Sequence, residues 1–244
     1  MGCNSSAPAS EPGSRGGSGN KRLISGTVEY IYFDGLRGRA DPLRQMFEYV
    51  GQPCNKKGYA PPDWEAAKAR GEGGEFGGGM PQVFFTENGK KVRLAQFSAI
   101  IRTLGIRYGL YNPKDWKQAR YIDPVIDTWA DFQGAGAGVL FAPNEEAKAA
   151  GVVKYEAVMD KFFRMLDKTM QHHGGKYIAG NSVTIADFIV ACLVGTYCLN
   201  EACPVAGVGK KLIQKYPTLH GYAKRIQAGQ DFPFATKRTD VAPF

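Results

Sequence analysis

The hydrophobic pattern at the start of the chain changes from that of a strand to that of a helix. Residues 28–33 form a β-branched and aromatic run, which predicts a strand. Apolar residues then recur at i, i+3, i+4 and i+7, which predicts an amphipathic helix; they are Leu43, Met46, Phe47 and Val50. The pattern therefore brings a strand tyrosine close to the N-terminus of a helix, whose free backbone N–H groups attract anions.

Tyr32, near the end of this strand, has two interpretations. A phenol beside these N–H groups could hold an ionised small-molecule thiol or acid. Alternatively, Tyr30 and Tyr32 share one face of the strand and would both be core residues, which is the commoner fate of strand aromatics. The pattern of this segment alone leaves both open.

A second group of strand signals follows at residues 80–104. Met80-Pro81 precedes the β run 82–85, Asn88-Gly89 is a strong hairpin signal, and 92–94 form the second arm. Apolar residues from Ala99 to Leu104 then predict a short helix. The order strand, helix, proline, strand, strand, helix is that of a thioredoxin-like domain, in which this proline bond is cis.

The second half of the chain has the helical period throughout. One apolar stripe comprises Tyr155, Val158, Met159, Phe162, Phe163 and Leu166. Thr184 and Asp187 have the spacing of a capping box, and the nearly all-apolar run 189–199 after them predicts a central helix.

Two segments of this half leave alternatives open. Pro124 implies that its helix either restarts or is kinked, because proline lacks a donor and clashes with the preceding turn. Residues 133–138 are rich in glycine, and they either line an open second-substrate pocket or form a loop.

Several segments in order resemble cytosolic glutathione S-transferases of the sigma class. They are Y-F-D-G-L-R-G-R-A-D (32–41), W-E-A-A-K (64–68), M-P (80–81), L-A-Q-F-S-A-I (94–100) and G-N-S-V-T-I-A-D-F (180–188). The resemblance implies an α/β thioredoxin-like N-terminal domain followed by an all-α helical domain. The expected divisions are a tail at 1–25, a glutathione-binding domain at 26–107, a linker at 108–113 and a helical domain at 114–244.

The resemblance also implies a catalytic residue and a set of glutathione contacts. Tyr32 would be catalytic, its hydroxyl donating a hydrogen bond to the sulfur of glutathione and favouring the thiolate, which is the nucleophile. The implied glutathione-binding residues are Arg39, Trp64, Lys68, Met80, Pro81, Gln96, Phe97, Ser98 and Asp131.

These contacts divide among the parts of the tripeptide. Trp64 and Lys68 would meet the glycyl carboxylate, and the Met80 backbone would pair with the cysteinyl amide. Gln96 would bind the γ-glutamyl end, and Asp131 would reach it from the neighbouring subunit of a homodimer. Arg39 or Arg37 would strengthen the positive field, although Arg37 could instead bridge the two domains.

The chain departs from the family pattern at three places. Gly35 or Leu36 is an insertion between the tyrosine and the first arginine. Phe97 stands where the family has serine, so Ser98 or the Phe97 amide would have to replace the hydroxyl. The loop 71–79 before Met80 contains six glycines and is expected to be mobile.

Charge and cysteine content exclude some classes of function. The net charge is +8, but the cations are scattered among acids with no aromatic-interleaved basic stripe, so a nucleic-acid partner is not expected. The five cysteines have no metal-ligand spacing, and we expect reduced thiols and no metal. The pair His172-His173 before Gly174-Gly175 reads as a solvated helix end.

The first residues carry a lipidation signal. Met1-Gly2-Cys3-Asn4-Ser5-Ser6 matches the acceptor for myristoylation at Gly2, and Cys3 is placed for palmitoylation. The competing explanation is that Gly2 follows the initiator by chance. With both acyl chains the protein would be cytoplasmic and anchored peripherally to a membrane.

Together these observations predict a membrane-tethered glutathione transferase with glutathione as co-substrate. It would conjugate the thiolate to electrophiles or isomerise a lipid peroxide. The alternative is a weakly active or inactive scaffold protein of the same fold, anchored by its tail.

Overall fold

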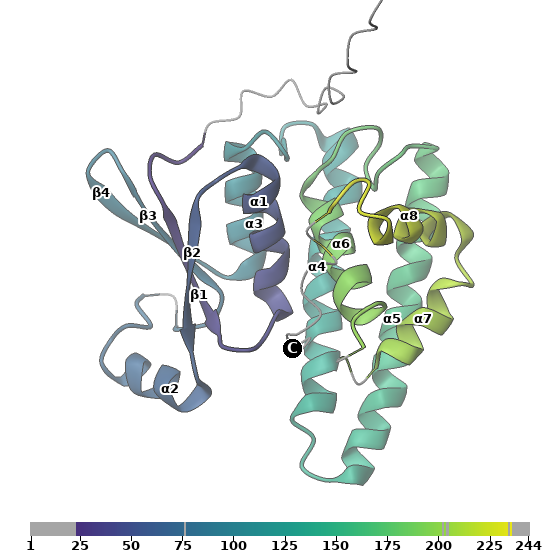
Figure 1. Ribbon diagram of the computed structural model, residues 1–244, viewed down its shortest axis with the longest axis horizontal. Helices are drawn as coiled ribbons and strands as arrows, with labels where there is room; N and C mark the ends of the chain where they lie inside the picture. Colours follow the sequence, from purple (N-terminus) through teal and green to yellow (C-terminus); the bar gives the residue numbers. More distant parts are fainter. Residues whose placement is uncertain (1–22, 76, 202, 204, 234, 236–244) are drawn as a thin grey trace, which may run out of the picture.

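The computed structural model describes residues 23–75, 77–201, 203, 205–233 and 235. A four-stranded sheet with its helices lies beside a bundle of longer helices (Figure 1). The first part runs from β1 to α3 and the second from α4 to α8. This arrangement confirms the fold class expected from the sequence, while the domain limits at 25, 107 and 113 stay a prediction.

The strands lie in the order β2-β1-β3-β4. They are β1 (Val28–Phe33), β2 (Cys54–Tyr59), β3 (Gln82–Glu87) and β4 (Lys90–Ala95). β1 pairs parallel with β2 and antiparallel with β3, and β3 forms a hairpin with β4. Asn88 and Gly89 join the hairpin with φ of 51° and 74°, as a type I′ turn requires. The predicted strand 28–33 and the hairpin are confirmed.

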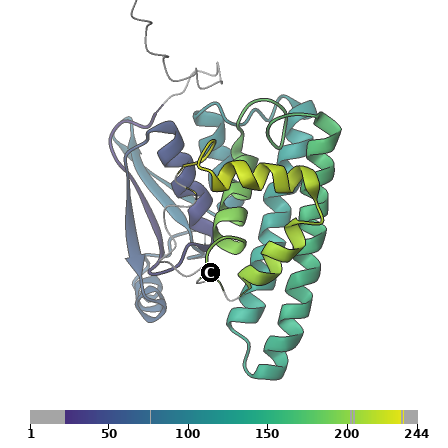
Figure 2. The ribbon, with the colours of Figure 1, turned by 45° about the vertical axis from the view of Figure 1, so that its right-hand side comes forward.

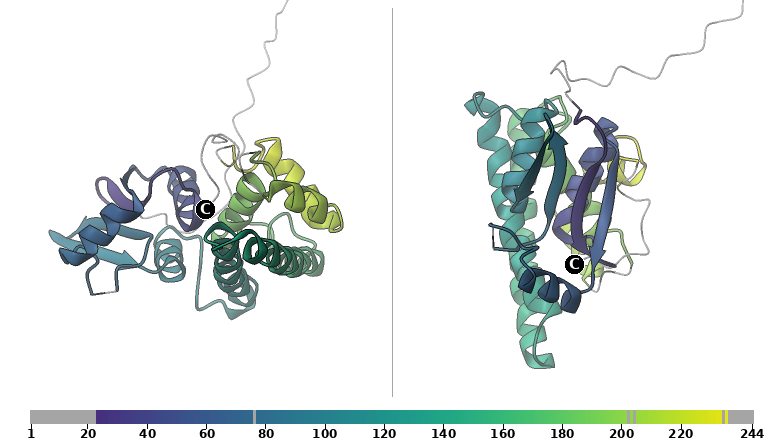
Figure 3. Two further views of the ribbon diagram at one scale, coloured as in Figure 1. Left: turned by 90° about the horizontal axis from the view of Figure 1, so that it is seen from below. Right: turned by 90° about the vertical axis from the view of Figure 1, so that its left-hand side faces the viewer.

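Three helices cover the two faces of this sheet. They are α1 (Asp41–Val50), α2 (Pro61–Ala69) and α3 (Phe97–Arg107). Figure 3 shows α1 and α3 between the sheet and the bundle, with α2 on the far side. Tyr30 and Tyr32 are buried on the α1 side, whereas Ile31 packs with Trp64 of α2 on the other face. The alternation of side chains along β1 thus sends its two tyrosines toward the bundle.

The bundle is built around a long helical hairpin, visible in Figure 2. Its helices are α4 (Trp116–Leu140), α5 (Glu145–His173), α6 (Ile185–Tyr197), α7 (Ala206–Ile213) and α8 (Pro217–Gln227). Every residue of α6 is buried, which confirms that it is the central helix. The stripe predicted on α5 also faces the core. None of the described helices combines the length and apolar composition needed to cross a bilayer.

Helix α4 continues through both segments that the sequence left open. Pro124 lies inside it, and residues 133–138 are helical. The helix buries Ile126, Trp129 and Phe132 completely. Burying such side chains contributes about 1.5–3 kcal/mol each, which offsets the roughly 3 kcal/mol that an interior proline costs.

Asp187 organises the start of α6, and the predicted capping box is present. The fully buried carboxylate accepts hydrogen bonds from the Thr184 N–H (2.8 Å), the Thr184 hydroxyl (3.0 Å), the Ile178 N–H (3.0 Å) and the Tyr222 hydroxyl (3.0 Å). Asp187 therefore joins α6 to the preceding turn and to α8, which is more than a local cap.

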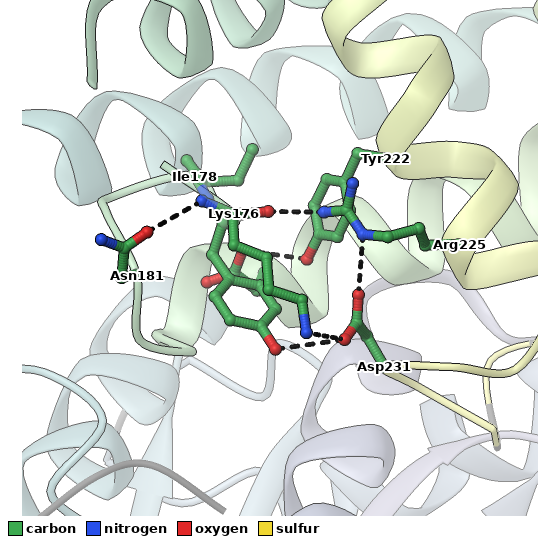
Figure 4. Close-up of polar contacts among 8 residues, drawn as sticks. Lys176, Ile178, Asn181, Tyr222, Arg225 and Asp231 are labelled. Carbon is green, nitrogen blue, oxygen red and sulfur yellow. Dashed lines mark hydrogen bonds and ion pairs between the residues drawn. The ribbon is translucent and has the colours of Figure 1, made fainter. Parts of the chain in front are cut away.

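A second carboxylate fastens the segment after α8 to this turn (Figure 4). Asp231 contacts Lys176 Nζ at 2.8 Å, and it accepts from Arg225 Nε and from the Tyr177 hydroxyl, both at 3.1 Å. The Lys176 N–H also donates to Asn181 Oδ1 at 3.2 Å. These contacts stabilise the turn that delivers Thr184 to α6.

Arg37 connects the two parts of the molecule. Its side chain is buried, and Nη1 donates to Thr196 Oγ1 of α6 at 3.3 Å. Of the two roles considered for Arg37, this contact favours the bridge between domains.

Candidate active site

Tyr32 lies near the end of β1, just before a single 3₁₀ turn, η1 (Gly38–Ala40). The backbone N–H of Arg39 in this turn donates to the Tyr32 hydroxyl oxygen at 3.1 Å. Gly38 makes the approach possible, because a Cβ at that position would lie 2.2 Å from the same oxygen. The Arg37-Gly38-Arg39 segment therefore holds the phenol through its backbone.

Burial is the main influence on the ionisation of Tyr32. It raises the pKa of the phenol above its ordinary value, and the hydrogen bond and positive charge of Arg39 offset only part of this effect. The hydroxyl is therefore protonated at neutral pH. Because its oxygen accepts from Arg39, its own proton is left to be donated to a ligand.

Tyr32 lines a cavity of about 340 Å³ between the first part of the molecule and α4. The other lining residues are Phe33, Leu36, Arg39, Gly79, Met80, Gln96, Gln133, Ala137, Leu140 and Phe141. Four residues predicted as site residues, Tyr32, Arg39, Met80 and Gln96, are thus brought together. Gln133 and Ala137 also line the cavity, in agreement with the pocket alternative for residues 133–138.

The Met80–Pro81 bond at this cavity is cis, as the sequence predicts. Gln96 directly precedes α3 and has φ 66° and ψ 114°, a conformation that non-glycine residues rarely adopt. Such backbone conformations cluster at ligand sites, where the surrounding structure maintains them. The N-terminal N–H groups of α3, beginning with that of Phe97, follow immediately.

The loop before Met80 is tied down by side chains from three elements. The Trp64 indole donates to the Gly78 carbonyl at 2.9 Å, and Gln82 Nε2 donates to the Gly73 and Gly79 carbonyls at 3.3 and 3.1 Å. Arg93 donates to the Glu72 carbonyl and, through Nε, to Gln82 Oε1 at 2.8 Å. The contacts of Trp64 and Arg93 come from 14 and 21 residues away and could not be predicted from the loop's own composition. The mobility of the loop stays a prediction.

The other predicted site residues do not line the cavity. The Trp64 indole N–H donates to the Gly78 carbonyl of the loop, and Lys68 Nζ pairs with Glu65 at 2.7 Å. Phe97 and Pro81 are buried and Ser98 is half-buried, whereas Asp131 is exposed on α4. The expected contact of Asp131 with a partner subunit stays a prediction. Gly2 and Cys3 lie outside the described residues.

Sequence reasoning did not single out the apolar side of this cavity. Phe33, Leu36, Leu140 and Phe141 line it, and the side chain of Phe141 is 74% exposed. A signal was present in the pair Leu140-Phe141, which places two large apolar residues shortly before the turn residues Pro143 and Asn144. Among the residues that the structure describes, no cluster of His, Cys, Asp and Glu could hold a metal.

Comparisons with known proteins agree with this fold. Residues 130–231 match the family described as "Glutathione S-transferase, C-terminal domain". Glutathione S-transferase 1 of Ascaris suum is 31% identical over 163 residues, covering 65% of this chain and 74% of that protein. Glutathione S-transferase A3 of Mus musculus is 29% identical, covering 83% of this chain and 85% of that protein.

A solved structure extends the likeness to three dimensions. The glutathione S-transferase described as a major nematode-specific enzyme of C. elegans superposes with a TM-score of 0.65 at 25% identity, covering 89% of this chain and 99% of that one. The chain belongs to the glutathione S-transferase family. The family expected from the sequence is therefore confirmed, while the sigma class stays a prediction. Members of this family are enzymes that use glutathione as co-substrate.

Proposed function

We propose that the protein is a glutathione transferase in which Tyr32 stabilises the glutathione thiolate. The observation that carries this proposal is the Arg39 N–H···Tyr32 hydrogen bond at the cavity wall, which leaves the hydroxyl proton available. A free thiol has a pKa of about 8.5, and lowering it by about two units requires roughly 2.7 kcal/mol. A hydrogen bond to a charged acceptor contributes about 1.5–3 kcal/mol, which is of the required size.

The remaining chemistry follows from the thiolate. Its sulfur attacks an electrophilic carbon to form a thioether, and the leaving group departs with the bonding electron pair. Arg39 at the cavity supplies a positive charge near the developing anion. No further catalytic group is needed for this substitution.

Glutathione would lie along the polar side of the cavity. The Met80 backbone would pair with the cysteinyl amide, and Gln96 with the Phe97 N–H would hold the γ-glutamyl carboxylate at the start of α3. Asp131 would contact the γ-glutamyl ammonium of a glutathione bound to the partner subunit of a homodimer. Trp64 and Lys68 reach the glycyl carboxylate only by exchanging their present contacts with Gly78 and Glu65.

The apolar side chains on the opposite wall support a hydrophobic second substrate. Leu36, Leu140 and Phe141 would contact it while Tyr32 holds the sulfur. We infer from the sequence motifs that the protein is sigma-like, and that a lipid-derived electrophile or a lipid peroxide is a suitable substrate. Acylation at Gly2 and Cys3 would place this activity at the cytoplasmic face of a membrane.

A scaffold function of the same fold is the second candidate. It is favoured by Trp64 and Lys68, which contact their own chain, and by Phe97, which replaces a hydroxyl. The engagement of Trp64 and Lys68 within the chain and the missing hydroxyl at Phe97 each remove an expected contact with glutathione. A protein without turnover would still present its surfaces at a membrane.

Retention on glutathione resin combined with a conjugation assay distinguishes the two. We expect the wild type to be retained and active, and Tyr32→Phe to lose about 100-fold in kcat/KM, equivalent to about 2.7 kcal/mol. Tyr30→Phe is the matched control, because Tyr30 lies on the same strand face but not at the cavity. Absence of both retention and conjugation in the wild type would favour the scaffold. For the tail, Gly2→Ala should release the protein from membranes, and unchanged partitioning would contradict acylation.

A further inference from the structure

The exposed large apolar side chains of the described residues fall into two groups at opposite ends of the molecule. Leu140, Phe141 and Val153 lie at the end where α4 meets α5, and the first two line the cavity. Leu23, Ile106 and Trp116 lie at the other end, where the described chain begins, α3 ends and α4 starts (Figures 1 and 2). This second group takes no part in the cavity.

We name this second end the tail-proximal face. It comprises the apolar residues Leu23, Ile106 and Trp116 and the exposed cations Lys90, Lys114, Lys117 and Arg120. The buried Gln52 connects the start of the described chain to the residue after α3. Its Oε1 accepts from the Ile24 N–H at 2.8 Å and from the Tyr108 hydroxyl at 3.4 Å. The start of the described chain is therefore fixed next to the end of α3.

The acids near this face are engaged by other groups. Glu87, at the hairpin beside Lys90, pairs with Arg107. Asp115 caps α4 by accepting from the Gln118 N–H at 3.3 Å. Asp115 keeps its negative charge, but it is one carboxylate against the four cations of the face, so the face has a net positive field.

Trp116 and Arg120 form the best-defined part of the face. The indole is 64% exposed, and the Arg120 guanidinium lies 5.9 Å from its centroid and 4.5 Å from that of Tyr121. Tyr121 in turn packs edge-on against His173, with centroids 3.9 Å apart. An exposed tryptophan beside lysine and arginine is the combination found at membrane interfaces, where the ring enters the headgroup layer and the cations meet acidic lipids.

We propose that the tail-proximal face binds an anionic lipid surface, with Trp116 entering the headgroup region. Residues 1–22 connect Gly2 and Cys3 to Leu23 at this face, so a lipid on either residue would be tethered to the same end of the described chain. One acyl chain anchors only marginally, and a basic surface supplies the second signal that stable binding needs. In this orientation the cavity, at the opposite end of β1, faces away from the membrane and stays open to substrate.

Intrinsic fluorescence gives a direct test, because the protein has three tryptophans and Trp64 and Trp129 are 3% and 0% exposed. The experiment uses the full-length Gly2→Ala protein, which cannot be myristoylated. It compares vesicles of phosphatidylcholine alone with vesicles containing phosphatidylserine. We expect sedimentation and a blue shift of the emission with the acidic vesicles only, and reversal of both in high salt.

Variants of the same protein distinguish binding through this face from binding that depends only on the net charge of the protein. We expect Lys117→Glu/Arg120→Glu to lower the partition coefficient more than tenfold, since each cation near an acidic surface contributes roughly a factor of five. Lys210→Glu/Lys211→Glu changes the charge equally on exposed positions of α7 and should bind nearly as the parent does. Trp116→Phe should abolish the blue shift but keep most of the sedimentation.

Three results would overturn the proposal. They are absence of binding to acidic vesicles, equal losses in the two charge-reversed variants, and a blue shift that survives Trp116→Phe. Binding of an acidic protein through this face without vesicle binding would also replace it. Because the face is remote from Tyr32, the conjugation assay on the same variants reports separately on the proposed activity.

Discussion

The backbone N–H of Arg39 points at the hydroxyl oxygen of Tyr32 from 3.1 Å, and no side chain separates them because position 38 is glycine. The phenol oxygen is thereby polarised by an amide dipole that is fixed before any ligand binds. This preorganisation is what a thiolate-stabilising hydroxyl requires, since no reorganisation is needed when charge develops on sulfur.

Gly38→Ala should disable the site while leaving the fold intact. The new Cβ would lie 2.2 Å from the Tyr32 oxygen, so either the phenol or the turn must move. We expect kcat/KM to fall at least tenfold in the conjugation assay. Gly35→Ala is the matched control, because Gly35 also has positive φ (69°) but has nothing within 4 Å of its Cβ position. Equal losses in the two variants would mean that backbone strain alone causes the effect.

Arg93→Lys should weaken glutathione binding without affecting the chemical step. Lysine cannot reproduce the fork that joins Gln82 and the Glu72 carbonyl, so the loop leading to Met80 loses a support. We expect KM for glutathione to rise by roughly three- to tenfold with kcat nearly unchanged. Arg107→Lys, in a partly exposed pair with Glu87, is the control and should behave as wild type. A loss confined to kcat would contradict this role.

Asp187→Ala should be one of the most destabilising substitutions in the chain. It removes the acceptor of the Thr184, Ile178 and Tyr222 donors in a fully buried place, and each buried donor left unsatisfied costs about 1–3 kcal/mol. We expect a loss of roughly 3–5 kcal/mol in urea unfolding, more than a cap alone contributes. Thr184→Ala, which removes only the cap hydroxyl, should cost about 1 kcal/mol. Similar losses for both would mean that Asp187 is only a local cap.

Asp231 should make stability depend on pH in the acid range. Burial raises the pKa of this carboxyl, but hydrogen bonds and charge from Lys176, Arg225 and Tyr177 outweigh burial and leave the pKa below its ordinary value. As the pH falls, the Asp231 carboxylate of the unfolded state therefore binds a proton before that of the folded state. This stabilisation is present above about pH 3.9 and is lost as the pH falls through the pKa of Asp231 in the folded state. Asp231→Asn should flatten the acid limb of unfolding free energy against pH, whereas Glu156→Gln, at an exposed position on α5, should not.

The features predicted correctly from the sequence are those with local causes. The capping box of α6, the Asn88-Gly89 turn and the cis bond before Pro81 each depend on a few neighbouring residues. Tyr32, Arg39, Met80 and Gln96, which the family motifs predict to be site residues, line one cavity, and their role in binding glutathione stays a prediction.

The features that escaped prediction depend on contacts between distant segments. The uninterrupted path of α4 through Pro124 requires the packing of Trp129 and Phe132 against the rest of the bundle. Likewise, the fastening of loop 71–79 requires Trp64 and Arg93 to reach its carbonyls. Local propensity favours a break in α4 at Pro124 and says nothing of contacts to the loop, so both features depend on tertiary packing.

The most direct test of the proposed mechanism is the pKa of the glutathione thiol when bound to the protein. It can be followed by the ultraviolet absorbance of the thiolate, with the protein alone subtracted. The four described thiols, Cys54, Cys192, Cys198 and Cys203, add little to this background, because burial raises the pKa of each. We predict that the bound thiol titrates about two units below the free value of about 8.5, and that Tyr32→Phe returns it to near that value. An unshifted thiol in the wild type, or the same low pKa in Tyr32→Phe, would contradict the role of the Tyr32 hydroxyl.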